Sequence, residues 1–421
     1  MLLNKIFFTL YNNSFIKRYL VKKMIRIYRR DKPEFQTPIV RYLTQRWVLK
    51  RDFILISNYK KIHPEKIEYI FKEKKRLHYS NLNFYNSRFS NLLHCGDEKD
   101  NYCVVFRDVN TICGSNLIIL DGKYVFYEFK QLVNNSNIDF TDHGVKFYKN
   151  DYLIIEANYG KEVFEEAVLF TGNYDSNLYH FIFEIIAKFE MLNKLNLPNQ
   201  TPLLVNKNCL KFSQFVEILN LFNNNRFKII GINHLEIYKV KKLYYLTCPN
   251  IIPPNYLETI NIESNQNLFD LDNIAFLRNR FLEMVAPINT SKKIFISRKG
   301  SSERRKYNEK EVTNFLIREE FQTINPAEHS MAEQISIFNN AEIIVGATGA
   351  AFSNILFCNK NCKIICLTNY KIDISIFSTL ASFVEVNMTY LFDKKLKLEK
   401  SSDIHSDFSI DINELREALN N

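Results

Sequence analysis

Short runs of apolar residues, separated by turn residues, dominate the chain between residues 101 and 172. Runs of about four to eight β-branched and aromatic residues with such boundaries are typical of strands. We expect strands at residues 102–107, 116–121, 123–129, 152–157 and 166–172. This part of the chain is therefore predicted to be rich in sheet.

The hydrophobic pattern changes its period after residue 175, and helices are predicted to alternate with strands. The expected order is helix 176–195, strand 203–206, helix 210–223 and strand 227–232. The segment CPNIIPP, residues 248–254, then places three prolines close together. Because proline breaks both helices and strands, this segment suggests a domain junction.

Regular alternation of helices with near-continuous apolar strands fills residues 268–367. The expected order is helix 268–285, strand 292–298, helix 308–319, strand 321–325, helix 330–340, strand 342–346, helix 351–358 and strand 363–367. Such alternation is typical of βαβ units and predicts an α/β fold with a doubly wound parallel sheet. Ligands bind these sheets beyond the carboxyl ends of the strands, so we expect chemistry after Ser297, Ile324 and Val345.

Length and composition agree with this organisation. A chain of 421 residues, 46% hydrophobic and 24% charged, is globular and long enough for about two to three domains. We expect a basic segment at residues 1–51, a sheet-rich and α/β domain at 52–254, and a Rossmann-like domain at 255–421. Two α/β halves joined near residue 254 would leave a cleft between them.

The positive charge is confined to one end of the chain. The formal net charge is +10, yet residues 1–51 hold 13 Lys and Arg against 2 Asp and Glu, which leaves residues 52–421 with a net charge of −1. Basic and apolar residues interleave over residues 1–30, as in an amphipathic helix that lies on an anionic membrane surface. A helix docked on the protein's own body explains the pattern equally well, and a mitochondrial presequence is a third interpretation.

Other features bear on location and on whole classes of function. No run of about 18 uncharged apolar residues occurs, and the apolar run 6–10 is too short for a signal-peptide core, so we expect a cytoplasmic protein. The eight scattered cysteines do not resemble a disulfide scaffold. Cys358, Cys362 and Cys366 are spaced four apart, but without a CxxC or paired His nearby they favour buried thiols over zinc.

The loop after the strand 292–298 concentrates positive charge. Its cations are Arg298, Lys299, Arg304, Arg305 and Lys306. A guanidinium offers bidentate geometry to phosphate, so this loop favours diphosphate binding, with a solvated basic loop as the alternative. Asn308 and Glu311, three residues apart at the start of a predicted helix, also form a helix-capping pattern.

A glycine turn follows the strand 342–346. Gly346 and Gly349 bracket it, and the small residue Ala350 opens the next helix, where free backbone amides can bind an anion. An ordinary strand-to-helix turn explains the same residues. No GxGxxG or GxxxxGK[ST] motif occurs, which weighs against dinucleotide oxidoreductases and P-loop enzymes.

Acidic residues follow the strand 321–325. Glu328 is placed to hold ribose hydroxyls, as an acidic residue does in many nucleotide sites. Ser330 and Glu333 have the spacing of a capping box, which favours a structural role for Glu333.

One predicted helix carries a polar stripe. Asn177, His180, Glu184 and Lys188 recur at steps of three or four in an otherwise apolar sequence. A His beside a Glu on one helical face is oriented and made more basic, which a general base for a hydroxyl requires. A stripe that faces water is the alternative.

These motifs, in this order and spacing, resemble glycosyltransferase family 61, whose bacterial members include capsular-polysaccharide enzymes. The matching segments are NLYHFIFEIIAKFEML (177–192), ISRKG (296–300) with the following Arg304, Asn308 and Glu309, and PAEHSMAEQISIFNNAEIIVGATGAAFSNILF (326–357). The resemblance covers roughly residues 165–370. The first hundred residues contribute nothing to it.

The resemblance implies a GT-B-like architecture, with two Rossmann-like domains facing a cleft, and inverting transfer without a cofactor or an obligatory metal. It implies that His180 and Glu184 face the acceptor, and that Arg298, Arg304 and Asn308 lie near the diphosphate of the donor. The donor pocket would be lined by Glu328, Thr348, Gly349, Ala350 and Asn354. Thr348 stands where many relatives carry His, and its hydroxyl cannot serve as an acid or base near neutral pH.

The function expected from the sequence is therefore transfer of a sugar from a nucleotide-sugar donor to a surface-polysaccharide or lipid-linked glycan acceptor, in assembly of the cell envelope. We expect it in the cytoplasm, with residues 1–30 as the candidate contact with the inner face of the membrane. A non-catalytic scaffold that keeps the same shell is the alternative. Nucleic-acid binding through the basic end is a third hypothesis, which the near-neutral remainder of the chain disfavours.

Overall fold

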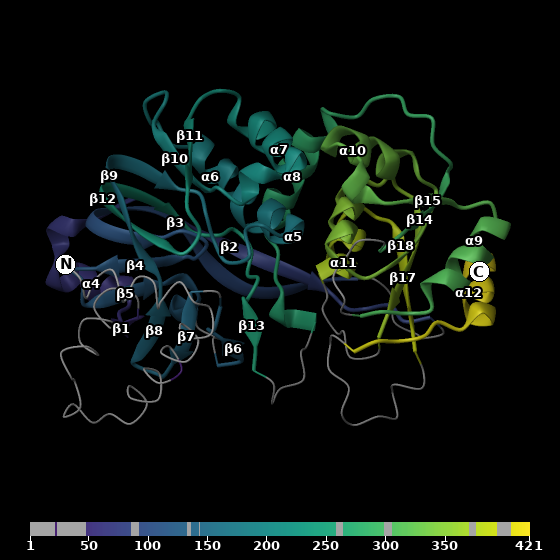
Figure 1. Ribbon diagram of the computed structural model, residues 1–421, viewed down its shortest axis with the longest axis horizontal. Coiled ribbons are helices and arrows are strands. Elements are labelled where there is room, and N and C mark those ends of the chain that lie inside the picture. Colours follow the sequence, from purple (N-terminus) through teal and green to yellow (C-terminus); the bar gives the residue numbers. More distant parts are fainter. Residues whose placement is uncertain are drawn as a thin grey trace, which may run out of the picture.

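Two sheets organise the protein (Figure 1). The computed structural model describes residue 22 and residues 48–85, 92–132, 136–142, 144–257, 264–298, 305–369, 376–393 and 406–421. One sheet has eleven strands and the other has five. The α/β class expected from the sequence is confirmed. Most of the basic segment 1–51, and also Arg304, lie outside the described residues.

The larger sheet is mixed and comes from the first half of the chain. Its strand order is β11-β10-β9-β12-β3-β4-β5-β1-β8-β7, with β2 paired to β3. Neighbours among β9 to β12 are parallel, whereas most other pairs are antiparallel. The strands are β1 (Val48–Phe53), β2 (Ile67–Ser80), β3 (Leu93–Ile112), β4 (Leu117–Leu120), β5 (Tyr124–Tyr127), β7 (Val145–Tyr148), β8 (Tyr152–Glu156), β9 (Asn158–Leu169), β10 (Pro202–Asn206), β11 (Lys228–Ile232) and β12 (Glu236–Leu246). The strands expected between residues 101 and 172 are all present.

Helices cover this sheet on the side that faces the other half of the molecule (Figure 1). They are α5 (Leu178–His180), α6 (Phe189–Asn193), α7 (Ser213–Asn223) and α8 (Leu271–Leu282), and α4 (Ile56–Ile62) lies at the far end. A small two-stranded sheet pairs β6 (Ile138–Asp139) with β13 (Asn255–Tyr256). The strand and helix positions expected between residues 176 and 285 are confirmed to within a few residues.

The second sheet is parallel and has the order β15-β14-β16-β17-β18. Its strands are β14 (Lys293–Ile296), β15 (Gln322–Ile324), β16 (Ile343–Ala347), β17 (Lys363–Thr368) and β18 (Asn387–Phe392), and its helices are α9 (Glu309–Arg318), α10 (Met331–Asn340), α11 (Ile376–Phe383) and α12 (Ile412–Asn420). The first four strands and helices α9 and α10 stand where the sequence predicts them. The helix expected at 351–358 is a 3₁₀ helix, Ala350–Phe357.

Local chemistry fixes two of the boundaries in this half. Ser330 and Glu333 form the expected capping box, with the Ser330 side chain accepting from the backbone of Glu333 and the Glu333 carboxylate from the backbone of Ser330. Gly346 lets β16 pass close to β14, because a Cβ there would come within 2.8 Å of the Cβ of Ile296. A larger residue would force these neighbouring strands apart.

The hairpin of β2 and β3 joins the two halves. Beyond β2, the backbone N–H of Tyr85 donates to the carbonyl of Tyr390 at 2.9 Å, and the N–H of Tyr390 donates to the carbonyl of Asn83 at 2.8 Å. Residues 83–85 therefore run parallel to β18 and add to the second sheet. Ser80 also bonds α11, because its N–H donates to Thr379 Oγ1 at 2.9 Å.

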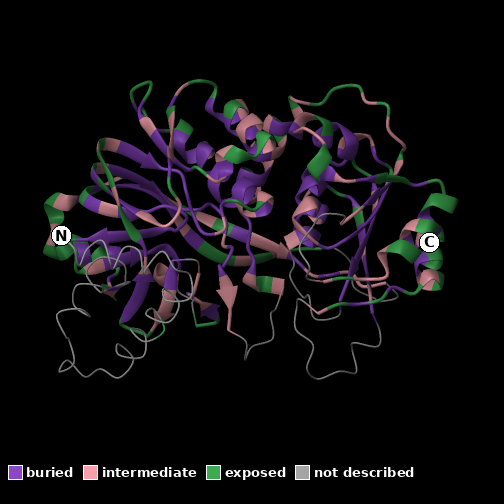
Figure 2. Ribbon diagram, in the orientation of Figure 1, coloured by how far each residue is buried: buried purple, intermediate pink, exposed green. Residues whose placement is uncertain are grey.

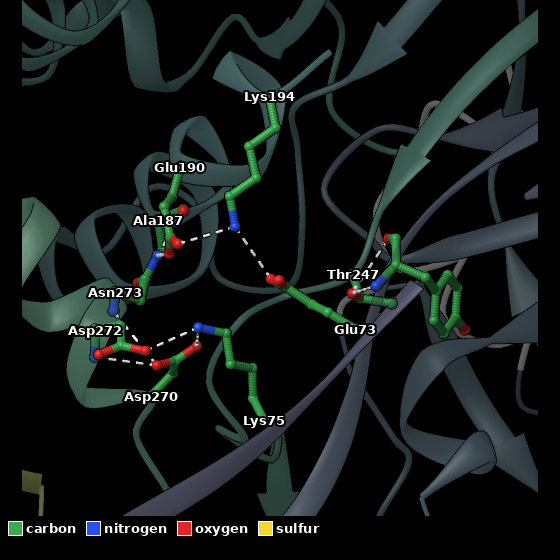
Figure 3. A network of polar contacts seen from close by, with 10 residues as sticks. Glu73, Lys75, Ala187, Glu190, Lys194, Thr247, Asp270, Asp272 and Asn273 are labelled. Atoms are coloured by element: carbon green, nitrogen blue, oxygen red, sulfur yellow. Dashed lines mark hydrogen bonds and ion pairs between the residues drawn. The ribbon is translucent and has the colours of Figure 1, made fainter. Parts of the chain in front are cut away.

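A network of charges ties β2 to α6, which follows the polar stripe, and to α8 (Figure 3). Lys194 of the turn after α6 contacts Glu73 at 3.2 Å and Glu190 at 3.3 Å, while Lys75 contacts Asp272 at 2.9 Å. Each exposed pair contributes little alone. Together they connect β2 to two helices that are far away in the sequence.

One hydrophobic core cluster crosses from the larger sheet to the smaller one. It includes Phe181 and Phe189 from the stripe helix and Ile296 and Phe352 from the second half. Figure 2 shows buried residues on both sides of the region where the halves meet. Within the described ranges, no helix has the length and apolar character needed to span a bilayer.

Candidate functional site

The polar stripe lies on a helical segment whose regular hydrogen bonding is interrupted. Asn177 caps its start, with its side chain accepting from the N–H of Tyr179 at 3.0 Å. Residues Phe181–Ile185 then form a π turn, and residues Ile186–Lys188 a 3₁₀ turn. π turns inside helices are frequent at functional sites, because they re-aim side chains on the helix.

His180 and Glu184 are in direct contact. Nδ1 of His180 is hydrogen-bonded to Oε2 of Glu184. The His180 side chain is 17% exposed and that of Glu184 is 3% exposed. The expected pair is therefore formed, and the Glu184 carboxylate is more deeply buried than the His180 ring. The interpretation of the stripe as a water-facing surface is wrong for Glu184 and for Lys188, which is also buried.

Burial and charge oppose each other at Glu184. Burial raises the pKa of the Glu184 carboxyl, while the neighbouring His180 lowers it through charge and hydrogen bonding. A carboxylate held on Nδ1 fixes the tautomer and the ring orientation of a histidine, and it leaves Nε2 to accept a proton. The arrangement suits a general base.

Aromatic rings enclose His180. Tyr174, in the loop after β9, lies with its ring centroid 5.4 Å from that of His180, and Tyr179 lies 5.2 Å away. Tyr174 has a left-handed backbone, with φ at 54°. Tyr179 also contacts Phe377 of α11, at 6.2 Å between ring centroids. No sequence pattern distinguishes Tyr174, because its position depends on the conformation of its loop.

The loop that holds Tyr174 is bordered by a buried carboxyl with an unusual pKa. Asp142 Oδ1 accepts from the N–H of Gly144 at 2.6 Å and also from the N–H of Val145, and its Oδ2 is enclosed. Burial raises the pKa of Asp142 to about 6. The negative charge of Asp142 in turn acts to raise the pKa of Tyr174.

Replacing Asp142 with Asn is expected to stabilise the protein at pH 8 and not at pH 4. An acid whose folded pKa lies above its unfolded value of about 3.9 contributes stability below that value, and the contribution is lost as pH rises through about 6. Asn keeps the accepting oxygen and removes the charge, so we expect a gain of up to about 2–3 kcal/mol at pH 8. Denaturant unfolding at the two pH values measures it, and an equal change at both would contradict the assignment.

Arg298 holds the glycine turn of the second half. Its Nη1 donates to the carbonyl of Thr348 at 2.8 Å, and its backbone N–H donates to Glu309 Oε1 at 2.8 Å. A Cβ on Gly349 would lie 3.9 Å from the same Nη1. Burial lowers the pKa of the Arg298 guanidinium. The structure therefore brings together three of the predicted donor residues: Arg298, Thr348 and Gly349.

The polar end of Thr348 points into the protein. Thr348 is buried, and its side chain lies near enough to the Cys366 thiol in β17 to act to lower the pKa of that thiol, which burial raises. Arg305, next to Arg304 in sequence, acts on the same thiol through its charge and has a left-handed backbone with φ at 58°. Arg305 thus lies near the carboxyl end of β17, a placement that the sequence does not distinguish from that of its basic neighbours.

Asn308, one of the predicted donor residues, is bonded to other parts of the protein. The amide of Asn308 donates to Glu311 Oε2 at 2.7 Å and to the carbonyl of Ile410 at 3.0 Å, and its Oδ1 accepts from the N–H of Ile410 at 2.8 Å. Asn308 precedes α9 as predicted, but its side chain does not cap the backbone of that helix. Asn308 instead holds the segment that leads into α12.

Asn354, Glu328 and Ala350 differ in how they are placed. Asn354 is fully buried and donates to Gln334 Oε1 at 2.9 Å. Glu328 is exposed and accepts from Asn325 Nδ2 at 2.8 Å. Ala350 is half-buried at the start of the 3₁₀ helix. That helix contacts α5, so the glycine turn and the His180 segment lie side by side.

The three cysteines spaced four apart lie in the interior of the second half. Cys358, Cys362 and Cys366 are buried, as the sequence predicts, and burial raises the pKa of the Cys358 and Cys366 thiols. Among the residues that the structure describes, no group of three or more His, Cys, Asp or Glu side chains is arranged to hold a metal ion.

Comparison with known proteins adds one finding. Residues 178–365 match the family model described as Glycosyltransferase 61, which supports glycosyltransferase activity for this chain. The matched range begins in α5 and ends in β17, so it contains both the His180 pair and the Arg298 turn. No curated protein matches the chain significantly.

Proposed function

We propose that the protein is an inverting glycosyltransferase that moves a sugar from a nucleotide-sugar donor to a glycan hydroxyl. The observation that carries the proposal is the placement of a carboxylate-backed histidine next to an arginine-held glycine turn. The family match over both elements supports it. In the proposed GT-B arrangement, the larger-sheet half binds the acceptor and the parallel-sheet half binds the donor.

In the proposed reaction, His180 is the general base. Its Nε2 takes the proton of the acceptor hydroxyl as the acceptor oxygen bonds to the anomeric carbon. The bond from that carbon to the diphosphate oxygen breaks, and the nucleoside diphosphate leaves with the electron pair. Attack opposite to the leaving group inverts the anomeric centre. Glu184 stabilises the imidazolium that forms, as a carboxylate does in other base pairs of this kind.

Arg298 carries the donor side of the proposal. An arginine at the carboxyl end of a central strand suits the leaving diphosphate, because its charge opposes the charge that develops there. Arg304 completes the proposed diphosphate contacts, Gly349 and Ala350 line the proposed donor pocket beside Thr348, and Glu328 contacts the ribose. Asn308 and Asn354 contribute by holding α12 and the 3₁₀ helix in place.

The proposed acceptor is a surface-polysaccharide or lipid-linked glycan on the cytoplasmic face of the membrane. The basic residues of segment 1–30 support this choice, because anionic headgroups attract such segments at about 1 kcal/mol per cation. The buried side chain of Thr348 favours a second candidate, a non-catalytic scaffold of the same shape. Donor hydrolysis or transfer by the purified protein would exclude the scaffold.

A thermal-shift screen tests the proposal. We expect one class among UDP, GDP, CDP and CMP, and the matching sugar nucleotide, to raise the melting temperature, because a ligand at about 100 times its Kd stabilises the folded state by about 2.7 kcal/mol. The shift identifies the donor class, and incubation of that donor with glycan acceptors then tests transfer. If no nucleotide shifts the wild-type protein, the donor site is refuted.

A further inference from the structure

The proposed base leaves one charge on its own helix unexplained. Lys188 lies one helical turn beyond Glu184 and is only 1% exposed. Burying an ammonium group is costly unless opposite charges and hydrogen bonds compensate. Its hydrogen-bond partner is the carbonyl of Thr171, at a long 3.5 Å. One long hydrogen bond compensates little of the cost of burying this ammonium group. We therefore look for a role of Lys188 in the electrostatics of the site.

A second buried carboxylate lies behind this lysine. Glu128 is 4% exposed and follows β5 directly. It accepts hydrogen bonds from Lys99 Nζ at 2.9 Å, from the hydroxyl of Tyr245 at 2.8 Å and from the N–H of Cys248 at 3.0 Å. A buried ammonium and two further donors therefore converge on the Glu128 carboxylate.

Shared neighbours connect Lys188 to both carboxylates. The ammonium of Lys188 lies 5.9 Å from the ring centroid of Tyr245, whose hydroxyl binds Glu128. Burial lowers the pKa of Lys188, whereas the charges of Glu128 and Glu184 act to raise it. Lys188 thus lies one helical turn from Glu184 and shares the neighbour Tyr245 with Glu128, and the charges of both carboxylates act on it.

The segment after β12 fixes these charges to the π turn. The carbonyl of Cys248 accepts from Lys99, and the side chain of Asn250 donates to the carbonyl of Phe183 at 2.7 Å. Phe183 lies within the π turn, which follows His180 directly and also contains Glu184. The buried charges are therefore attached to the element that sets the orientation of His180.

We propose that Lys188, with the Glu128 and Lys99 pair behind it, is a positioning residue that keeps Glu184 ionised against His180. The catalytic role of the His180–Glu184 pair rests on the proposed function. The effect of Lys188 on the charge of that pair does not depend on it. The charges of Lys99 and Lys188 oppose those of Glu128 and Glu184. Asp175, a further buried acid, faces Lys188 from the loop after β9: burial raises the pKa of its carboxyl, and the charge of Lys188 acts to lower it. Other titratable groups near these carboxylates are neutral at physiological pH, because burial raises the pKa of each: Tyr127, Tyr179, Tyr245 and Cys248.

Two single substitutions with opposite effects on charge test the proposal. Lys188→Met removes a positive charge, so the His180–Glu184 pair should bind its proton more tightly and its apparent pKa should rise by about one unit or more. Glu128→Gln removes a negative charge and keeps the hydrogen-bond acceptor, so the apparent pKa should fall. NMR titration of the His180 ring in the folded, full-length protein measures both shifts, with His180→Ala used to assign the signal.

Lys194→Met is the matched control. Lys194 lies further along the same helical segment and its side chain is 44% exposed, so water and salt screen its charge. It should leave the apparent pKa within about 0.2 units of wild type. The double variant Lys188→Met with Glu128→Gln restores the charge balance and should return the pKa toward the wild-type value.

The titration separates this inference from the proposed function. Where transfer is measurable, the acid limb of kcat/KM should move with the titration of His180, upward in Lys188→Met and downward in Glu128→Gln. If the apparent pKa of the His180–Glu184 pair shifts in opposite directions in the two variants and no transfer is detected, the role of Lys188 and Glu128 is supported and the proposed reaction is refuted. A folded Lys188→Met or Glu128→Gln variant whose His180 pair titrates as in wild type would overturn the proposal.

Discussion

Replacing His180 with alanine is expected to reduce sugar transfer by about 10²- to 10⁴-fold while donor binding is retained. The imidazole is the group that accepts the acceptor proton in the proposed reaction, and Glu184 alone cannot replace it, because it lies on the buried side of the ring. The donor contacts belong to the other half of the molecule. Steady-state transfer and nucleotide-induced thermal shift, measured on the same variant, separate the two effects.

His63→Ala serves as the control for this substitution. The His63 side chain is about a third exposed and contacts Glu65 and Asp121, near the start of the larger sheet. Its removal should leave both transfer and donor binding unchanged. Wild-type turnover in His180→Ala would remove this residue from the mechanism, and loss of the nucleotide shift would mean that the residue also supports the donor site.

Replacing Arg298 with alanine is expected to weaken donor binding by about 10- to 100-fold. Hydrogen bonds to charged groups contribute about 1.5–3 kcal/mol each, and this guanidinium is held at the glycine turn by its bond to the carbonyl of Thr348. The nucleotide Kd, from titration calorimetry or from thermal shift against concentration, measures the loss. Arg298→Lys should recover part of the affinity, because the charge remains but bidentate geometry does not.

Arg278→Ala is a closely matched control for Arg298→Ala. Arg278 is also partly buried, burial lowers its pKa, and its guanidinium donates to the carbonyls of Leu356 and Cys358, at the other end of the 3₁₀ helix. Both variants lose a support of the same helix, so both should be less stable. Only Arg298→Ala should lose donor affinity; an equal loss in Arg278→Ala would show that Arg298 acts through the helix.

The parallel-sheet half was largely predictable from the sequence because its signals are local. Its central strands are continuous apolar runs, as in residues Ile343–Ala347. The spacing of Ser330 and Glu333 in the sequence marks the start of a helix. The contact of His180 with Glu184 was predictable for the same reason, since helical periodicity places residues four apart on one face. These features can be recognised without knowing which distant parts of the chain pack against them.

Features that depend on distant residues were not predictable. Along most of the long strand β2, exposed residues alternate with half-buried ones, and few are fully buried. The strand is held by its pairing with β3. The bonds of Asn308 to Ile410, about a hundred residues away, replace the backbone cap that its position suggests. The burial of Lys188 likewise depends on distant residues, Glu128 after β5 and Tyr245 in β12, whereas the helical spacing alone was equally compatible with solvent.

The pairing of residues 83–85 with β18 has a consequence for any shortened form of the protein. In the full chain, the backbone N–H and C=O of Tyr390 are both bonded by this segment. A fragment that contained only residues 255–421 would lack it, and β18 would become an open edge strand with unpaired amides and carbonyls. Such edges recruit other strands, so this fragment should self-associate or aggregate unless residues 80–85 are supplied with it.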